Sequence, residues 1–353
     1  MKKTIFTFFA LIIFAGFISC KKESSPGTAA ASTCKITDML TNGSGDLQAA
    51  DPYTFTTTEK IEYNDKNLQS GFTSQTSTLY KSKKTSTYSY SNNYQYDANG
   101  FAIKQVAQSS GTDKAGTYTS NNYTTTFEYT NSRLTKSTST GVASTGGKTV
   151  NSTGTVTYEY TTDGKLSKYA NVYAGSDGSS GNSFVLFEYS NGKVSKYSYS
   201  SGSSIITPLI ELNSQGFVTK LVTSTDETRN SYDAEGNRVR QEQWSGGKKT
   251  DIRIITMDNK KNAFALYAQP LKGHPDFTFF SGRFNISSYT HNVSRDESIY
   301  VSPAGVEIPE GHTDYTYQYN SNNFPAAVDI KYTDSNGKIS QQSSKSYTYT
   351  GCQ

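Results

Sequence analysis

A short phrase that recurs along the chain is the feature that most constrains its fold. Its clearest copy, Y-E-Y-T-T-D-G-K-L-S-K-Y, runs from Tyr158 to Tyr169. Tyr158 and Tyr160 alternate with polar residues, which is the period-two pattern of a strand with two unlike faces. Asp163-Gly164 then predicts a tight turn, because glycine adopts a positive φ without steric cost. The phrase therefore predicts one β-hairpin.

Related phrases recur along most of the chain. They begin at Ile61, Tyr94, Phe127, Phe187, Glu211, Tyr232, Tyr317 and Tyr332. Stretches rich in Ser, Thr and Gly lie between them, at 109–120, 138–153 and 175–183, and we interpret these as turns at the far ends of the strands. Each unit then contributes two strands to an antiparallel meander. Beyond the N-terminal segment no stretch has a convincing helical period, so the sequence predicts an all-β fold.

The composition fits a folded sheet with one packed face and one wet face. Only 33% of residues are apolar, but 27 Tyr and 18 Phe supply large side chains for burial. The formal net charge is +4, and removing residues 1–19 takes away Lys2 and Lys3 and leaves +2. So small a charge gives no electrostatic footprint for nucleic acid.

The N-terminus predicts export and lipid anchoring. A basic start and an apolar run from Ile5 to Ile18 form a secretory signal peptide over residues 1–19. The run ends at F-I-S-C, which is similar to a bacterial lipobox with Cys20 as the lipidated residue. Residues 20–33 would then be a flexible tether to a membrane, and the folded domain would span 34–352. The alternative is an ordinary secreted protein that is cleaved nearby.

The two remaining cysteines lie near the ends of that domain. Cys34 and Cys352 could form a disulfide in an oxidising compartment, which would require the first and last strands to be neighbours; the alternative is two unrelated thiols. A long sheet also has unpaired edges that invite aggregation. Closure would remove them, so we expect a strongly curled or barrel-like sheet. A membrane-spanning barrel is disfavoured, because the strands carry Ser and Thr at outward positions.

These phrases resemble the YD (Rhs-type) repeat, and more closely the YD-repeat-like lipoproteins of Bacteroidetes whose function is uncharacterised. The match is best over 232–239, Y-D-A-E-G-N-R-V. T-M-D-N-K-K-N-A-F at 256–264 and R-F-N-I at 283–286 resemble two further phrases of that group, as do both ends of the domain. The resemblance implies a porin-like antiparallel sheet of hairpins on the cell envelope, and it implies no known activity.

Catalytic motifs are missing from the sequence. The three histidines, His274, His291 and His312, have no metal-ligand spacing, and no nucleophile elbow or phosphate-binding loop occurs. The recurring turn aspartates do not complete a calcium loop, and their role in tight turns explains them. We therefore expect no enzyme, no metal and no cofactor.

A binding site is expected in an irregular insertion at about 257–314. Long loops on a rigid sheet often carry function, and aromatic residues in or near this region could stack on a sugar. The candidate ligand-binding residues are Trp244, Tyr267, Phe277, Phe279 and Tyr289.

Together these features predict a lipid-anchored outer-membrane protein, on the cell surface or on the periplasmic face. Its expected role is non-catalytic: structural, adhesive or scaffolding. The alternative is a glycan-binding component of a nutrient-uptake system. The expected partners are the membrane, through the anchor, and glycans or other envelope proteins.

Overall fold

The computed structural model describes residues 34–201, 204–262, 271–275 and 289–351. They form one sheet of 21 strands, with no helix in these ranges, so the predicted all-β fold is confirmed. The strands are β1 (Lys35–Gly45), β2 (Tyr53–Tyr63), β3 (Gln69–Tyr80), β4 (Thr85–Tyr96), β5 (Ala102–Thr112), β6 (Tyr118–Thr130), β7 (Arg133–Thr145), β8 (Lys148–Tyr160), β9 (Leu166–Gly175), β10 (Ser180–Ser190), β11 (Lys193–Ser201), β12 (Ser204–Ile206), β13 (Leu209–Leu212), β14 (Val218–Thr223), β15 (Asp226–Tyr232), β16 (Arg238–Ser245), β17 (Lys248–Lys261), β18 (His291–Val301), β19 (Glu307–Tyr319), β20 (Pro325–Asp334) and β21 (Ile339–Thr350).

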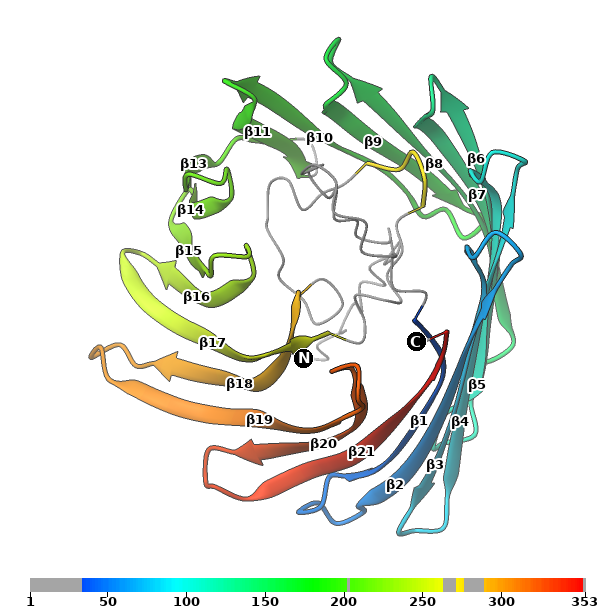
Figure 1. Cartoon of the computed structure of the whole chain (residues 1–353), viewed down its shortest axis with the longest axis vertical. Helices are drawn as coiled ribbons and strands as arrows, with labels where there is room; N and C mark the ends of the chain where they lie inside the picture. The colour runs from blue at the N-terminus through cyan, green and yellow to red at the C-terminus, as the bar shows by residue number, and fades with distance from the viewer. Residues whose placement is uncertain (1–33, 202–203, 263–270, 276–288, 352–353) are drawn as a thin grey trace.

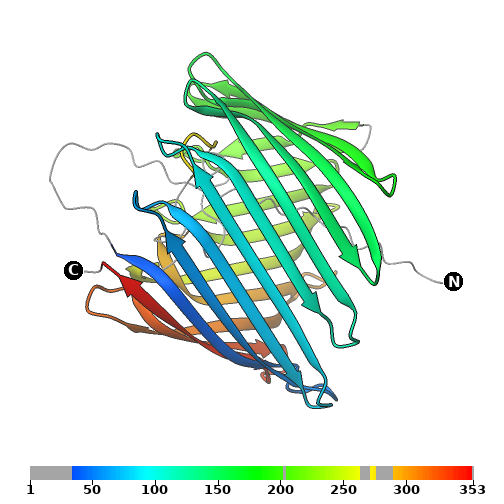
Figure 2. The same cartoon turned by 90° about the vertical axis from the view of Figure 1, so that its right-hand side faces the viewer.

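The strands form an antiparallel meander in which neighbours in the chain are neighbours in the sheet (Figures 1 and 2). Two places depart from this order, and the first joins the two ends of the domain: β1 pairs with β21 from Lys35↔Thr350 to Ser44↔Gln342. The first and last strands are therefore neighbours. This long-range pairing makes the two ends of the domain one continuous part of the sheet.

The sheet is interrupted at Pro208. In the described part of the chain, β12 pairs with β11 and β13 pairs with β14, but no ladder joins β12 to β13. Pro208 lies between these two short strands and has no amide hydrogen to donate to a neighbouring strand. The sheet is therefore open at this point.

In several repeats one side chain fixes the turn. In the β4–β5 hairpin, Asp97 Oδ1 accepts hydrogen bonds from the amides of Asn99 and Phe101, both at 2.9 Å. Gly100 has φ 83°, a value that glycine adopts without strain. Asn64, Asn213, Asn320 and Asp334 accept the same pair of bonds in their own turns. The recurring Asp and Asn residues thus stabilise turns, as their positions predict.

In most units a tyrosine ties the hairpin to the preceding one. Tyr129 follows a β-bulge and donates its hydroxyl hydrogen to the carbonyl oxygen of Ala102 at 2.8 Å. Ala102 pairs with Tyr96, which donates in turn to the carbonyl of Gln69 at 2.6 Å. The same bond joins Tyr63 to Ile36, Tyr160 to Leu134, Tyr189 to Leu166, Tyr232 to Val218 and Tyr349 to Pro325. We call this series the tyrosine ladder.

The ladder has a gap beside the break in the sheet. Leu212 follows the bulge in β13, where other units carry tyrosine, and its side chain has no hydroxyl group.

Burial keeps the tyrosines of the ladder protonated. It raises the pKa of Tyr160, for example, to about 12. The hydroxyl groups therefore remain donors at neutral pH.

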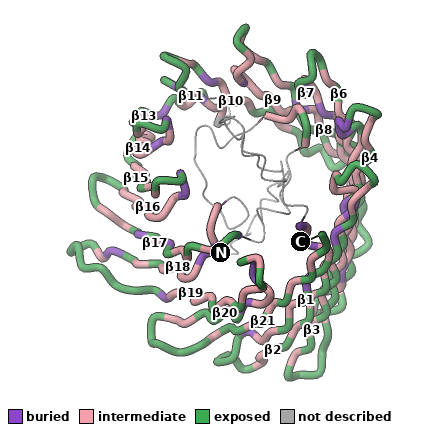
Figure 3. The backbone as a smooth tube through the Cα atoms, viewed as in Figure 1, coloured by how far each residue is buried: buried purple, intermediate pink, exposed green. Residues whose placement is uncertain are grey.

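The apolar core lies along the sheet face that carries the ladder, which we call the tyrosine face. It consists of several clusters, one of which is Leu166, Phe187 and Val194. Ile210 of β13 packs against this cluster, so apolar packing continues across the break at Pro208. In Figure 3 exposed residues gather at the ends of the hairpins, and buried residues form short patches within the strands.

Two regions that the sequence led us to expect as irregular contain long strands in the part of the chain that the structure describes. The Ser/Thr-rich stretches were interpreted as turns, but 138–153 lies mostly in β7 and β8, with its turn at Gly146-Gly147. Likewise β17, β18 and β19 occupy much of 257–314. Low apolarity concealed the strands of 138–153, because Ser and Thr at alternate positions form a polar strand face as well as they form a loop.

Candidate functional site

Successive side chains of a strand point to opposite faces of the sheet, and paired residues share a face. In β2–β8 the face opposite the tyrosine face is composed mainly of Ser, Thr, Asn and Gln, and we call it the hydroxyl face. One row of paired residues illustrates it: Gln75, Ser89, Ser110 and Ser120 lie side by side across β3 to β6. The sheet therefore presents an apolar aromatic face and a hydrophilic one.

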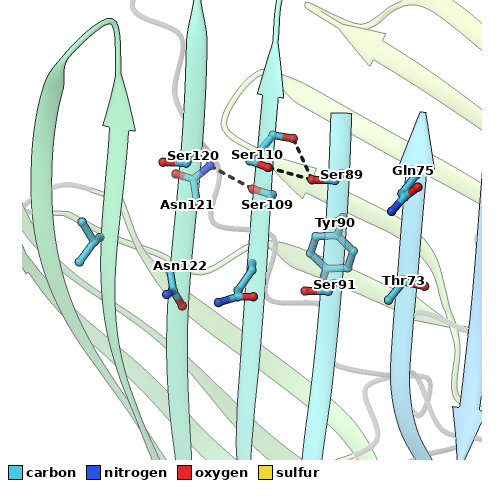
Figure 4. Close-up of a pocket in the computed structure, with 12 residues that line it drawn as sticks. Thr73, Gln75, Ser89, Tyr90, Ser91, Ser109, Ser110, Ser120, Asn121 and Asn122 are labelled. Atoms are coloured by element: carbon cyan, nitrogen blue, oxygen red, sulfur yellow. Dashed lines mark hydrogen bonds between the residues drawn. The ribbon is translucent and has the colours of Figure 1, made fainter. Parts of the chain in front are cut away.

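A groove of about 580 Å³ lies on β3–β7, and residues of the hydroxyl face form most of its lining (Figure 4). Two neighbouring rows of paired side chains form its floor. One row contains Gln75, Ser89, Ser110 and Ser120, and the other contains Thr73, Ser91, Gln108, Asn122 and Val142. Tyr90, Ser109 and Asn121 complete the lining, which contains no charged residue.

The polar side chains in this groove have few partners within the protein. Ser89 and Ser110 share a hydrogen bond of 2.8 Å between their hydroxyl groups. By contrast, within the described structure the side chains of Gln75, Gln108 and Asn122 make no hydrogen bond or ion pair, and all three are exposed. Their donors and acceptors are therefore available to a ligand.

Several polar side chains on the tyrosine face of the same strands are paired with one another. Gln105 Nε2 donates to Asn92 Oδ1 at 3.0 Å and to the hydroxyl oxygen of Tyr94 at 3.2 Å. Asn121 Nδ2 donates to Ser109 Oγ at 3.2 Å. The difference between the faces indicates that the tyrosine face contributes to stability and that the hydroxyl face is free to bind.

A second groove, of about 400 Å³, continues the first toward β2. The two grooves share Gln75, Ser89 and Ser110 in their linings. Tyr118 lies in the second groove and Val142 in the first, and the side chains are 56% and 43% exposed. The combined surface thus offers hydrogen-bonding groups together with exposed apolar surface on Tyr118 and Val142.

Of the residues predicted to bind a ligand, Trp244 lies on β16 within a network of charges. The guanidinium carbon of Arg229 lies 4.2 Å from the centroid of its ring, and Lys249 Nζ lies 5.5 Å away. Its Nε1 donates to Glu242 at 3.3 Å. Burial alone would raise the pKa of Glu242, but hydrogen bonds from Arg240 and Lys249 outweigh it and lower the pKa. This carboxylate is therefore held ionised.

Tyr289 is buried, with 2% of its surface exposed, and packs with Ile255 and Val293. Its hydroxyl group donates to the carbonyl of Arg238 at 3.3 Å, which is the bond that a ladder tyrosine would make in this unit. It therefore takes a place in the tyrosine ladder. The other predicted binding residues, Tyr267, Phe277 and Phe279, lie outside the described residues.

Buried asparagines hold both ends of the connection between β17 and β18. Asn262 Nδ2 donates to the carbonyl of Tyr289 at 2.8 Å. Asn237 Nδ2 donates to Thr290 Oγ1 at 2.8 Å, and its Oδ1 accepts from the Thr290 amide at 3.0 Å. Asn237 and Asn262 belong to the phrases on which the YD-repeat resemblance rests, and here they anchor the chain.

Residues 271–275 of that connection dock on the tyrosine face of distant hairpins. His274 Nε2 lies 2.9 Å from the hydroxyl oxygen of Tyr129, and its ring packs edge-on against Phe127 with centroids 5.1 Å apart. The Leu134 amide donates to the carbonyl of Gly273 at 2.8 Å. Burial lowers the pKa of His274 to about 4, so the ring is neutral at neutral pH.

The anchoring residues are placed as follows. Cys34 is buried and disulfide-bonded. Cys20 and Cys352 lie outside the described residues, so the proposed lipid site and the proposed Cys34–Cys352 pairing stay predictions.

Among the described residues no three His, Cys, Asp or Glu side chains gather as a metal site would require. The same residues contain no helix that is long and apolar enough to cross a membrane.

Comparison with known proteins identifies no family for this chain. No family model matches the chain, and no curated protein matches it. Among solved structures, a porin-like protein from Bacteroides uniformis is 16% identical over 89% of this chain and 98% of that one, with a TM-score of 0.34. A protein named as AttH from Nitrosomonas europaea is 10% identical over 90% and 93%, with a TM-score of 0.16. Similarity at this level supports no argument about the function or the location of this chain.

Proposed function

We propose that this chain is a non-catalytic protein of the cell envelope that uses its sheet as a scaffold for adhesion. The observation that carries the proposal is the contrast between the two faces of the sheet. The tyrosine ladder and the apolar clusters stabilise one face. The hydroxyl face of the same strands presents side chains that have no partner within the described structure.

The anchor belongs to the same proposal. A lipid on Cys20 and a tether over residues 20–33 would hold the domain at the outer membrane, after removal of the signal peptide over residues 1–19. Membership of the YD-repeat-like lipoproteins, and a barrel-like curvature of the sheet, are further parts of it. Closure of the sheet would have to form at the interruption between β12 and β13.

Protease digestion of intact cells tests the location. Digestion of the domain on intact cells would support display on the cell surface, where adhesion is possible. Survival until the outer membrane is opened would contradict adhesion and favour a periplasmic scaffold. A Cys20→Ala variant should leave the membrane fraction, and its retention there would contradict the lipid anchor.

A second candidate, a glycan-binding component of a nutrient-uptake system, is favoured by the uncharged groove. Neutral hydroxyl and amide groups pair with the hydroxyl groups of sugars without requiring a charge on either side. The two candidates share one surface and differ in what it binds.

A further inference from the structure

We propose that the two joined grooves of the hydroxyl face form a binding site for an extended, uncharged polysaccharide. The inference rests on the proposed non-catalytic binding role and names the class of ligand. The candidate residues predicted from the sequence lie elsewhere, on β16 and around the β17–β18 connection. The new site is on β2–β7.

The lack of charge in the lining selects the class of ligand. Residues from both grooves supply hydroxyl groups, primary amides, one glycine, one valine and three tyrosines, but no Lys, Arg, Asp or Glu. A phosphate, a nucleic acid or a metal ion would find no countercharge there. A neutral sugar needs none, because a serine hydroxyl or a glutamine amide both donates and accepts hydrogen bonds.

The free side chains stand at intervals across the strands. Gln75 on β3, Gln108 on β5 and Asn122 on β6 are exposed and have no hydrogen-bond partner within the described structure. Adjacent strands lie about 4.8 Å apart, so these groups, which stand in two neighbouring rows, would meet a ligand at several separate points across the sheet. Such spacing suits a chain of sugar units better than a single sugar.

Apolar contacts complete the match to a sugar chain. Tyr118 offers an exposed ring in the second groove, and Val142 offers an exposed side chain in the first. Each sugar ring has an apolar C–H surface, and an aromatic side chain with a polar tip covers such a surface well. The shared residues Gln75, Ser89 and Ser110 make the two grooves one continuous surface.

The test is affinity electrophoresis of the purified full-length protein in gels containing dextran, soluble starch or hydroxyethylcellulose. A gel with polygalacturonate serves as the charged comparison. The test variant is Gln108→Ala with Asn122→Ala. The matched control is Gln95→Ala, because Gln95 is an exposed amide on β4 that does not line either groove. Circular dichroism confirms that all three proteins keep the same fold.

We expect at least one neutral polysaccharide to retard the wild type and the control equally, with at least tenfold weaker binding for the double variant. Absence of retardation in all three neutral gels would overturn the inference, as would equal retardation of the double variant. Retardation in polygalacturonate alone would also overturn it. Surface display and cell adhesion that persist in any of these cases would leave the proposed function standing with another class of ligand.

Discussion

At the scale of single residues, the ladder hydroxyl groups are the contacts whose contribution can be isolated most cleanly. We expect Tyr160→Phe to lower the free energy of unfolding by about 1 kcal/mol, because it removes a partly buried hydrogen bond to the Leu134 carbonyl and leaves the ring in place. Tyr173→Phe is the matched control, since the Tyr173 side chain is 45% exposed and makes no hydrogen bond within the described structure. Urea unfolding measures both, and equal losses would contradict a role for the ladder.

Aromatic rings that lie over cross-strand glycines give a second prediction at this scale. A Cβ on Gly141 would lie 2.1 Å from Tyr123 Cδ1, so Gly141→Ala must displace the ring. We expect a loss of about 1–3 kcal/mol. A Cβ on Gly154, on the adjacent strand, would lie 3.8 Å from its nearest neighbour, the carbonyl oxygen of Val172. Gly154→Ala should therefore be neutral or slightly stabilising. Thermal unfolding of the two variants checks this, and a tolerated Gly141→Ala would show that the Tyr123 ring is free to move.

The residues of the turns were predictable, whereas their long-range partners were not. Gly164 was expected to adopt a positive φ, and its φ is 88°. The acceptor of the Tyr160 hydroxyl group is 26 residues away in the sequence. Only the register of the sheet brings the two together, so no local pattern could reveal that bond.

At the scale of elements, the docked segment 271–275 should respond to acid. The pKa of His274 is lowered to about 4 in the folded protein from 6.5, so the unfolded or undocked state binds more protons between these two values. The contribution of His274 to docking stability is therefore fully present above pH 6.5, and it is lost as the pH drops from 6.5 toward 4. Full protonation of His274 would destabilise the docked state by about 3 kcal/mol relative to the undocked state.

Hydrogen exchange at the Leu134 amide reports on this docking, because that amide donates to Gly273. We expect its protection to fall between pH 6.5 and 4 in the wild type and to change much less in His274→Gln. The Phe324 amide, which donates to the uncharged Asn320 side chain, is the control and should not respond. Identical pH profiles for the wild type and His274→Gln would contradict the assignment.

The elements themselves were predictable in kind but not in length. Period-two alternation identified hairpins, yet Thr138–Thr153 was interpreted as a turn although most of it is strand. Polar strands bury little, so the hydropathy signal disappears where the hydroxyl face is most extensive. The signal that could have located the groove was the run of uncharged Ser, Thr, Asn and Gln at alternate positions of residues 85–93 and 120–126.

At the scale of the whole molecule, the interruption at Pro208 decides whether the sheet can close. Continuing the register of Tyr199↔Ile206 would place residue 208 opposite Tyr197. A proline there cannot donate a backbone hydrogen bond. The sequence shows Pro208, but it does not show which strand lies beside it, so this interruption could not be predicted.

We expect Pro208→Val to join β12 and β13 into one strand and to slow amide exchange at residues 209–211. Pro303→Val is the matched control, because Pro303 lies in the turn between β18 and β19, where no strand can be extended. The control should be neutral or slightly destabilising. Unchanged exchange in Pro208→Val would mean that the strand geometry, and not the missing donor, keeps the sheet open.

The pairing of β1 with β21 has a consequence for the order of folding. Every other ladder joins strands that are close in the chain, so the hairpins from β2 onward can form one after another at low entropic cost. β1 can pair with β2 early, but its other edge stays vacant until the last strand arrives. An emerging chain therefore carries one open edge from the beginning of synthesis to its end. The C-terminal strand both completes the sheet and ends that exposure.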